Sequence, residues 1–272
     1  MRAQIPKDHT AFPSCAKDFR GESETSLQWL QPLAELAEHS DFLIASTVGS
    51  FAFASQEFRM PRLIFMGPKG GGDTIRLGLF ATFHGDEPEG AEALVEFFQE
   101  LERAPGTAKG FHLYAYPVCN PSGLAAGTRD NSAGRDLAAE FWRKSAQPEI
   151  YYLEREMGVH AFQGVVSLHT GKSAVRFRAA CRSPVLDAAI VQPAIRATRG
   201  FVPGVVQESG GSDDFIPSGF LTATDELRPV PFEINLGIPR LLPKPSRVHG
   251  TAAALRSLLH SYRELMAHGQ NL

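Results

Sequence analysis

"IRLGLFATFHGDEPEGAEALVEFFQELERA", residues 75–104, joins an apolar segment to an amphipathic one through a charged turn. The first part, up to Phe83, is almost continuously apolar, as expected of a central strand that is covered on both faces. After the turn, Pro88 suits the first turn of a helix. Apolar residues then recur at helical spacing, namely Leu94, Phe97, Phe98 and Leu101. A strand that leads into a helix is the building unit of an α/β sheet.

The rest of the chain repeats this alternation. Short β-branched or alternating stretches predict strands at 41–48, 50–58, 62–67, 111–118, 164–171 and 231–239. Helical spacing predicts helices at 23–39, 136–144, 148–162 and 246–269. We therefore expect a single α/β domain over residues 1–272, with a mixed, mostly parallel central sheet and helices on both faces. Residues 1–60 would supply an N-terminal helix and edge strands.

The charge and apolar content of the chain do not favour nucleic acids or membranes as partners. The formal net charge of −3 comes from interspersed charges, which does not favour nucleic acid or a membrane surface. No run approaches the roughly 18 apolar residues of a membrane span, and residues 1–19 lack the apolar core of a signal peptide. Cys15, Cys119 and Cys181 include no CxxC pair, which favours a reducing, cytoplasmic compartment. The oligomeric state stays open.

The charged turn after Phe83 calls for a chemical reason. His84, Asp86, Glu87 and Glu89 crowd into six positions there, and His169 follows the apolar stretch GVVSL. Ligands of open α/β sheets bind just beyond the carboxyl ends of strands. Two histidines and one carboxylate at such ends are the ligand set of a catalytic zinc site with one position left for water. Taken singly, a His-x-x-Glu pair is typical of a solvated turn, and a lone histidine is typical of a core.

Four motifs in order carry a family resemblance. HGDEPEG (84–90), NPSG with Arg129, Asn131, Gly134 and Asp136-Leu137 (120–137), SLHT (167–170) and FEINLG (232–237) resemble the zinc carboxypeptidase family. The branch most similar to this pattern contains succinylglutamate desuccinylase and aspartoacylase. The resemblance runs from about residue 62 to about 240, which is most of the chain. It implies a zinc carboxypeptidase-like fold, one Zn²⁺ ion and hydrolysis of amide bonds.

The resemblance also implies roles for individual residues. His84, Glu87 and His169 would be the zinc ligands. Arg129 would polarise the scissile carbonyl and hold the oxyanion, and Asp136 would orient the first ligand histidine. Zinc-bound water would be the nucleophile, and the substrate would be a peptide or an N-acyl amino acid. Asn120 and Asn131 of the loop motif are candidates for contacts with this substrate.

The general base has two rival positions. Family members present the catalytic glutamate on a late strand, and PFEINLGIP supplies Glu233. Related sequences sometimes have the glutamate nearer the proline, which would place Gly237 at a vacated base position. Residues 233 and 237 share one face of a strand but lie about 13 Å apart, so that one cannot replace the other. Glu208 and Glu226 are weaker candidates.

The chain departs from the family at the substrate clamp. The usual Asp-Leu-Asn-Arg reads Asp136-Leu137-Ala138-Ala139, which removes the bidentate contact to a substrate carboxylate. The tyrosine that peptidase members carry between the second histidine and the catalytic glutamate is also missing. Lys172, Arg176 and Arg178 follow His169, and we expect Arg176 or Arg178 to bind the carboxylate instead. A basic strand face turned to solvent is the alternative.

Two other functional hypotheses remain. The lost clamp and the ambiguous base are compatible with a pseudoenzyme that retains its metal and binds a small ligand or peptide without turnover. A globular protein with no metal would require the ordered series of motifs to be a coincidence.

Overall fold

The computed structural model describes residues 30–171, 176–202 and 219–269. The stretch 75–104 folds as its pattern predicts, with strand β3 (Ile75–Ala81) leading through a turn into helix α2 (Glu89–Arg103). Pro88 is the N-cap residue of α2, and Glu89 and Glu92 lie in its first turn, where carboxylates interact favourably with the helix dipole. The charged turn therefore lies at the carboxyl end of β3.

Seven strands form one sheet in the order β1-β2-β4-β3-β5-β7-β6. The central strands β4, β3, β5 and β7 are parallel, while β1, β2 and β6 run antiparallel to their neighbours. Besides β3, the strands are β1 (Leu43–Phe53), β2 (Gln56–Met66), β4 (Phe111–Tyr116), β5 (Gly164–Gly171), β6 (Arg178–Cys181) and β7 (Phe232–Pro239). The prediction of an α/β domain with a mixed, centrally parallel sheet is confirmed.

The helices lie before, between and after the strands. They are α1 (Gln31–Ala37), α3 (Pro121–Ala126), α4 (Pro148–His160), α5 (Pro184–Leu186), α6 (Gln192–Ala197) and α7 (Lys244–Gly269). Three 3₁₀ turns (Pro105–Ala108, Leu137–Ala139 and Arg199–Phe201) and a π-helical turn (Asp187–Val191) complete them. No helix in the described ranges combines the length and apolar character of a membrane span.

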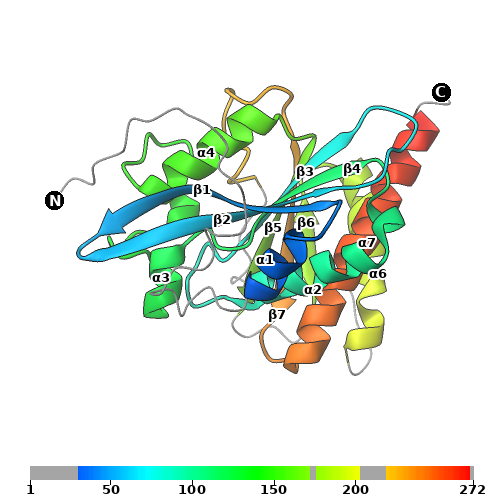
Figure 1. Cartoon of the computed structure of the whole chain (residues 1–272). Coiled ribbons are helices and arrows are strands. Elements are labelled where there is room, and N and C mark those ends of the chain that lie inside the picture. The colour runs from blue at the N-terminus through cyan, green and yellow to red at the C-terminus, as the bar shows by residue number, and fades with distance from the viewer. Residues whose placement is uncertain (1–29, 172–175, 203–218, 270–272) are drawn as a thin grey trace.

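Alternate strand residues face two separate cores. On one side of the sheet, Val166 and Leu168 of β5 pack in a large cluster with residues of α1, α2, α6 and α7. On the other side, Val165 of β5 packs in a second cluster with Ile150 and other residues of α4. Helices therefore cover both faces (Figure 1). Because side chains alternate along a strand, His169 shares the α4 side of the sheet with Val165.

Two expected elements differ from the sequence pattern. Residues 136–144 were expected to be a helix, but only Leu137–Ala139 forms a 3₁₀ turn, because Trp142 and Lys144 adopt positive φ angles of 60° and 56°. The three strands expected between residues 41 and 67 are two long strands, β1 and β2, paired as a hairpin. The helix expected at 23–39 lies partly outside the described residues, which contain its last part as α1.

Candidate metal centre

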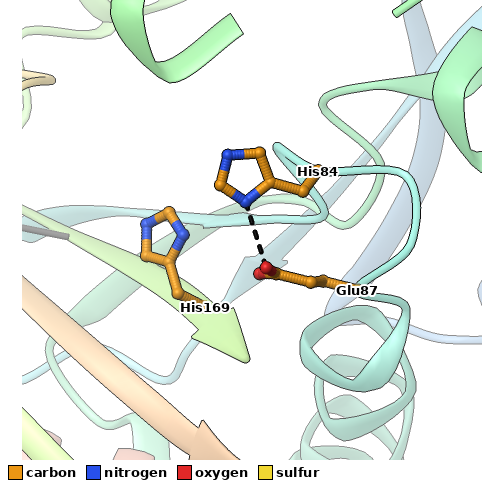
Figure 2. A group of neighbouring side chains, drawn as sticks. All are labelled: His84, Glu87 and His169. Atoms are coloured by element: carbon orange, nitrogen blue, oxygen red, sulfur yellow. Dashed lines mark hydrogen bonds and ion pairs between the residues drawn. The ribbon is translucent and has the colours of Figure 1, made fainter. Parts of the chain in front are cut away.

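Three side chains from separate parts of the sequence meet at the carboxyl end of the sheet. His84 follows β3, Glu87 precedes α2, and His169 lies near the end of β5 (Figure 2). Strands β3 and β5 are parallel neighbours, with Ala81 paired to Leu168, so their carboxyl ends coincide. One ligand atom from each of the three residues lies within 4.8 Å of the others, and all three side chains are buried.

His169 is a buried imidazole near the end of β5. Neither of its ring nitrogens has a partner among the described residues, although the side chain is 5% exposed. Burial, together with the charges of His84 and Arg129, lowers the pKa of His169 to about 3, so the ring is neutral. Buried polar atoms are ordinarily paired. A neutral imidazole with free nitrogens is instead what a metal ion requires.

His84 is held between two carboxylates. Its Nδ1 lies 3.1 Å from Oε1 of Glu87, and its Nε2 lies 3.2 Å from Oδ1 of Asp136. Burial lowers the pKa of His84, but the hydrogen bonds to Asp136 and Glu87 and the charge of Glu87 outweigh it and raise the pKa to about 9. Positive charge is therefore favoured at this point, and a metal ion there would take the place of the proton.

Glu87 is fixed from its other side by the strand that carries His169. Its Oε2 accepts a hydrogen bond of 2.9 Å from the backbone N–H of Thr170. Its Oε1 faces His84. Ligating carboxylates are themselves commonly hydrogen-bonded in metal sites. The hydrogen bond thus joins the turn after β3 to the end of β5.

The residues present fit a zinc ion. Two imidazoles and one carboxylate form the donor set of a catalytic zinc site, in which the fourth position is open. Asp136 contacts the nitrogen of His84 that points away from Glu87, as a residue that orients a ligand histidine should. The hydrogen bond to His84 lowers the pKa of Asp136 to about 2 against the opposing effect of burial, and the charges of His84 and Arg129 add to this lowering. Asp136 is therefore an anion at neutral pH.

Arg129 lies at the opening of the centre. Its Nη2 donates to Oδ2 of Asp136 at 3.2 Å, and its Nη1 lies 3.9 Å from Oε1 of Glu87. The side chain is 42% exposed, in contrast to the buried ligand residues. The guanidinium is thus beside the three residues yet accessible from solvent.

Asn120 holds the loop of Arg129 in place. Its Nδ2 donates to the carbonyl oxygens of Phe83 and Arg129, and its Oδ1 accepts from the N–H of Gly123 as the N-cap of α3. The side chain is fully buried. The amide hydrogens of Asn120 are thus used within the fold, and its contact with a substrate stays a prediction.

Asn131 holds together the loop between Arg129 and Asp136. Its Nδ2 donates to Gln147, and its Oδ1 accepts from the N–H groups of Ala133 and Arg135. These contacts close the turn that leads to Asp136. The contact of Asn131 with a substrate likewise stays a prediction.

Glu233 does not lie at the centre. In the parallel pairing of β5 with β7, His169 is opposite Gly237, while Glu233 is opposite Val165. Four strand residues separate Glu233 from the position beside His169, a distance of about 13 Å. The carboxylate of Glu233 accepts instead from the N–H and the hydroxyl of Thr222, at 3.0 and 2.9 Å. The described residues therefore do not bring Glu233 beside His169, and its role as general base stays a prediction.

Arg178 and His169 are both paired with Gly237, so the three residues form a row across strands β6, β7 and β5. Arg178 pairs with Gly237 on the far side of β7, and directly paired residues point to the same face. Ala179 and Cys181 pack against the cluster of α2 and α7, so that Arg178, which alternates with them in β6, faces the opposite side, that of His169. Arg176 precedes β6. Lys172 and Glu208 lie outside the described residues. Glu226 is exposed.

Sequence reasoning missed an aromatic cluster at His169. The ring of Phe83 stacks on His169 with centroids 5.5 Å apart, and Phe220 meets His169 edge-on at 5.7 Å. Phe141 contacts Phe83 and Phe220. Phe83 adjoins the motif of His84 and was therefore detectable. Phe220 lies in a stretch without periodicity that gave no signal.

No family model and no curated protein matches the sequence. The structure, however, is similar to a metallo-carboxypeptidase from Burkholderia cenocepacia, with a TM-score of 0.67 and 14% identity over 89% of this chain and 69% of that one. The chain has the metallocarboxypeptidase fold. A metallo-carboxypeptidase from Pseudomonas aeruginosa shares this fold with a TM-score of 0.62 and 20% identity, over 86% of this chain and 68% of the other.

The structure is also similar to a protein of the desuccinylase branch, which the motifs resemble. A succinylglutamate desuccinylase from Silicibacter has a TM-score of 0.53 and 17% identity, over 82% of this chain and 68% of that one. The fold that the resemblance implied is thus confirmed.

Proposed function

We propose that the protein is a metal-dependent hydrolase of amide bonds, with zinc held by His84, Glu87 and His169. The observation that carries this proposal is the imidazole of His169, which is buried and neutral and has no hydrogen-bond partner in the described ranges. The metallo-carboxypeptidases and the desuccinylase of the same fold support the reaction class. Cys119 and Cys181 are free thiols, which agrees with the cytoplasm as the proposed compartment.

Each group at the centre has a chemical task. A zinc ion, when bound, would lower the pKa of a water molecule and polarise the carbonyl of the substrate. Arg129 donates hydrogen bonds to the developing oxyanion, because its guanidinium stays charged and is partly open to solvent. Asp136 holds Arg129 and His84 in their orientations through one carboxylate.

Arg178 is the proposed anchor for a substrate carboxylate. The family clamp is lost, since Ala138 and Ala139 occupy its positions in and next to a 3₁₀ turn. Arg178 and His169 face the same side across β7, about 10 Å apart, with Gly237 between them. A substrate that reaches from His169 to Arg178 would place its scissile amide near His169 and its carboxylate near Arg178. The Pseudomonas protein is in complex with a succinic acid derivative, which supports a carboxylate ligand.

A second function is favoured by one specific observation. Neither position proposed for the general base presents a carboxylate beside His169, since Glu233 is held by Thr222 and residue 237 is glycine. A protein that retains the metal and binds an N-acyl amino acid or peptide without cleaving it would have this arrangement. The two functions share the metal and the ligand but differ in turnover.

Turnover by the zinc-loaded protein decides between them. The substrates are a panel of peptides with varied C-termini and a panel of N-acyl amino acids, with His84→Ala as the blank. We expect cleavage that disappears in the blank. Zinc bound in stoichiometric amount without cleavage would favour the binding function. In that case Gly237→Glu, with Gly237→Gln as its matched control, tests whether a carboxylate beside His169 restores turnover.

A further inference from the structure

Glu233 is a buried carboxylate, and its Oε2 accepts hydrogen bonds from the segment 219–222. It is 5% exposed, and Thr222 donates both its N–H and its hydroxyl to the same carboxylate oxygen. Burial raises the pKa of Glu233, while hydrogen bonds from the backbone of Gly219, Leu221 and Thr222 oppose that rise. A buried carboxylate is costly unless it is hydrogen-bonded. The two hydrogen bonds to its Oε2 hold Thr222, while its Oε1 has no partner among the described residues.

Two further contacts hold the same segment. The indole Nε1 of Trp142 donates to the carbonyl oxygen of Leu221 at 2.8 Å, and the side chain of Leu221 is fully buried. Gly219 has a φ of 105°, a conformation that favours glycine. Leu221 and Thr222, which follow Phe220, are therefore held by side chains from distant parts of the chain.

The fixed segment places one aromatic ring against a candidate metal ligand. The ring centroid of Phe220 lies 5.7 Å from that of His169, 5.1 Å from Phe83 and 5.6 Å from Phe141. Phe83 and Phe141 are buried, whereas Phe220 is partly exposed. Of these three phenylalanines, Phe220 thus presents the largest accessible surface beside His169.

We propose that Glu233 is a positioning residue, whose carboxylate holds residues 219–222 so that Phe220 forms an aromatic wall at His169 against which an aromatic or apolar group of the ligand packs. This inference rests on the proposed site at His84, Glu87 and His169 but does not require turnover. Aromatic rings form the apolar lining of many small-molecule sites, and a ring in contact with another ring gains more than its buried area alone provides.

The variants separate the parts of this inference. Glu233→Met removes every acceptor, Glu233→Gln keeps one, and Phe220→Ala removes the wall itself. Glu226→Gln is the control, because it neutralises an exposed carboxylate in the same connection. All are made in a Trp29→Phe background, so that Trp142 is the single tryptophan of the two in the chain. Circular dichroism and zinc content identify any variant that does not fold.

Two readouts are measured on the zinc-loaded proteins. The first is the emission of Trp142, which reports its hydrogen bond to Leu221. The second is the binding of N-acetyl-phenylalanine relative to N-acetyl-alanine, measured by calorimetry. We expect Phe220→Ala to lower this ratio of affinities about tenfold. Glu233→Met should lower the ratio similarly and shift the emission, Glu233→Gln should recover part of both, and Glu226→Gln should change neither.

Three results would overturn the inference. One is equal loss of affinity for both ligands in Phe220→Ala. Another is a wild-type ratio and emission in Glu233→Met. The third, measurable if the wild type turns over, is a fall in kcat of roughly 100-fold or more in Glu233→Gln with unchanged selectivity, which would mark a general base. Absence of turnover in the wild type would count against the hydrolase alone, because the binding ratio is still measured.

Discussion

At the scale of the residue, His169 differs from an ordinary core histidine. Its ring stacks on Phe83 as a core aromatic would, yet both nitrogens lack partners among the described residues. A buried polar atom without a partner costs about 1–3 kcal/mol, and replacing it by an apolar group of similar shape is neutral or stabilising. The chain therefore keeps this histidine at a cost in stability.

His169→Leu tests that statement. Without metal, we expect the variant to be as stable as the wild type or more stable, because the unpaired nitrogens are gone. In the presence of zinc, we expect the variant to show no rise in Tm. Differential scanning calorimetry with and without zinc measures both. A metal-free variant several degrees less stable than the wild type would show that His169 is a satisfied core residue.

Arg178 leads to a prediction of its own. Because it faces the same side of the sheet as His169, Arg178→Ala should raise KM at least tenfold for substrates with a carboxylate, as loss of a charged hydrogen bond does. Amidated analogues should show little change. Steady-state kinetics on matched acid and amide substrates give both values. An equal rise for acid and amide would exclude the anchor.

At the scale of the element, one buried carboxylate joins β2, β4 and α4. A single oxygen of Glu156 in α4 accepts from Arg62 of β2 at 2.8 Å and from Tyr116 of β4 at 2.9 Å, and lies 3.2 Å from Nε2 of His160. Burial raises the pKa of Glu156, but the hydrogen bonds to His160 and Arg62 and the charge of Arg62 outweigh it and lower the pKa to about 2. The helix thus docks through an ionised group.

The pH dependence of stability follows from this pKa. The folded value is below the ordinary value of 4.5, so the stabilisation is complete above about pH 5 and is lost as the pH falls toward 2. It amounts to on the order of 3 kcal/mol. We expect Glu156→Gln to be less stable at pH 7 and to lose less stability on acidification. Urea unfolding from pH 7 to pH 3 measures this, with exposed Glu57→Gln as a control whose slope matches the wild type.

At the scale of the whole molecule, metal binding should stabilise the fold as a unit, because the ligands join β3, α2 and β5. Zinc at about 100 times its Kd contributes roughly 2.7 kcal/mol, which corresponds to a rise in Tm of about 5–10 °C. A chelator should reverse the rise. His84→Ala should show no response to zinc, and an undiminished response in that variant would place the metal elsewhere.

Strands, helices and the turns between them are predictable from the sequence because each depends on residues that are close together in the chain. The apolar stretch at 75–83 and the spacing of Leu94, Phe97, Phe98 and Leu101 predict β3 and α2 without knowledge of the rest. The turn with His84 and Glu87, and His169 at a second strand end, predict a shared site because parallel strands end at one edge. The structure brings these three residues together.

The pairing register of the strands and the side-chain contacts within loops could not be predicted from the sequence. Whether Glu233 or Gly237 lies beside His169 depends on which residues of β5 and β7 pair, and the strand sequence FEINLG does not state it. Likewise Asn120 and Asn131 look like ligand contacts in a polar loop until their partners are known. Phe220 reaches His169 through contacts with distant Glu233 and Trp142, which no local pattern encodes.

The order of the strands has a consequence for synthesis on the ribosome. Strand β6, at the edge of the sheet, is translated about fifty residues before β7, its neighbour, which inserts between β5 and β6. A nascent chain can therefore bring His84, Glu87 and His169 out of the exit tunnel while Arg178 has no strand to pair with. The pairing of Arg178 with Gly237 forms only after β7 has emerged, so the three candidate ligands are synthesised before the proposed anchor has its place in the sheet.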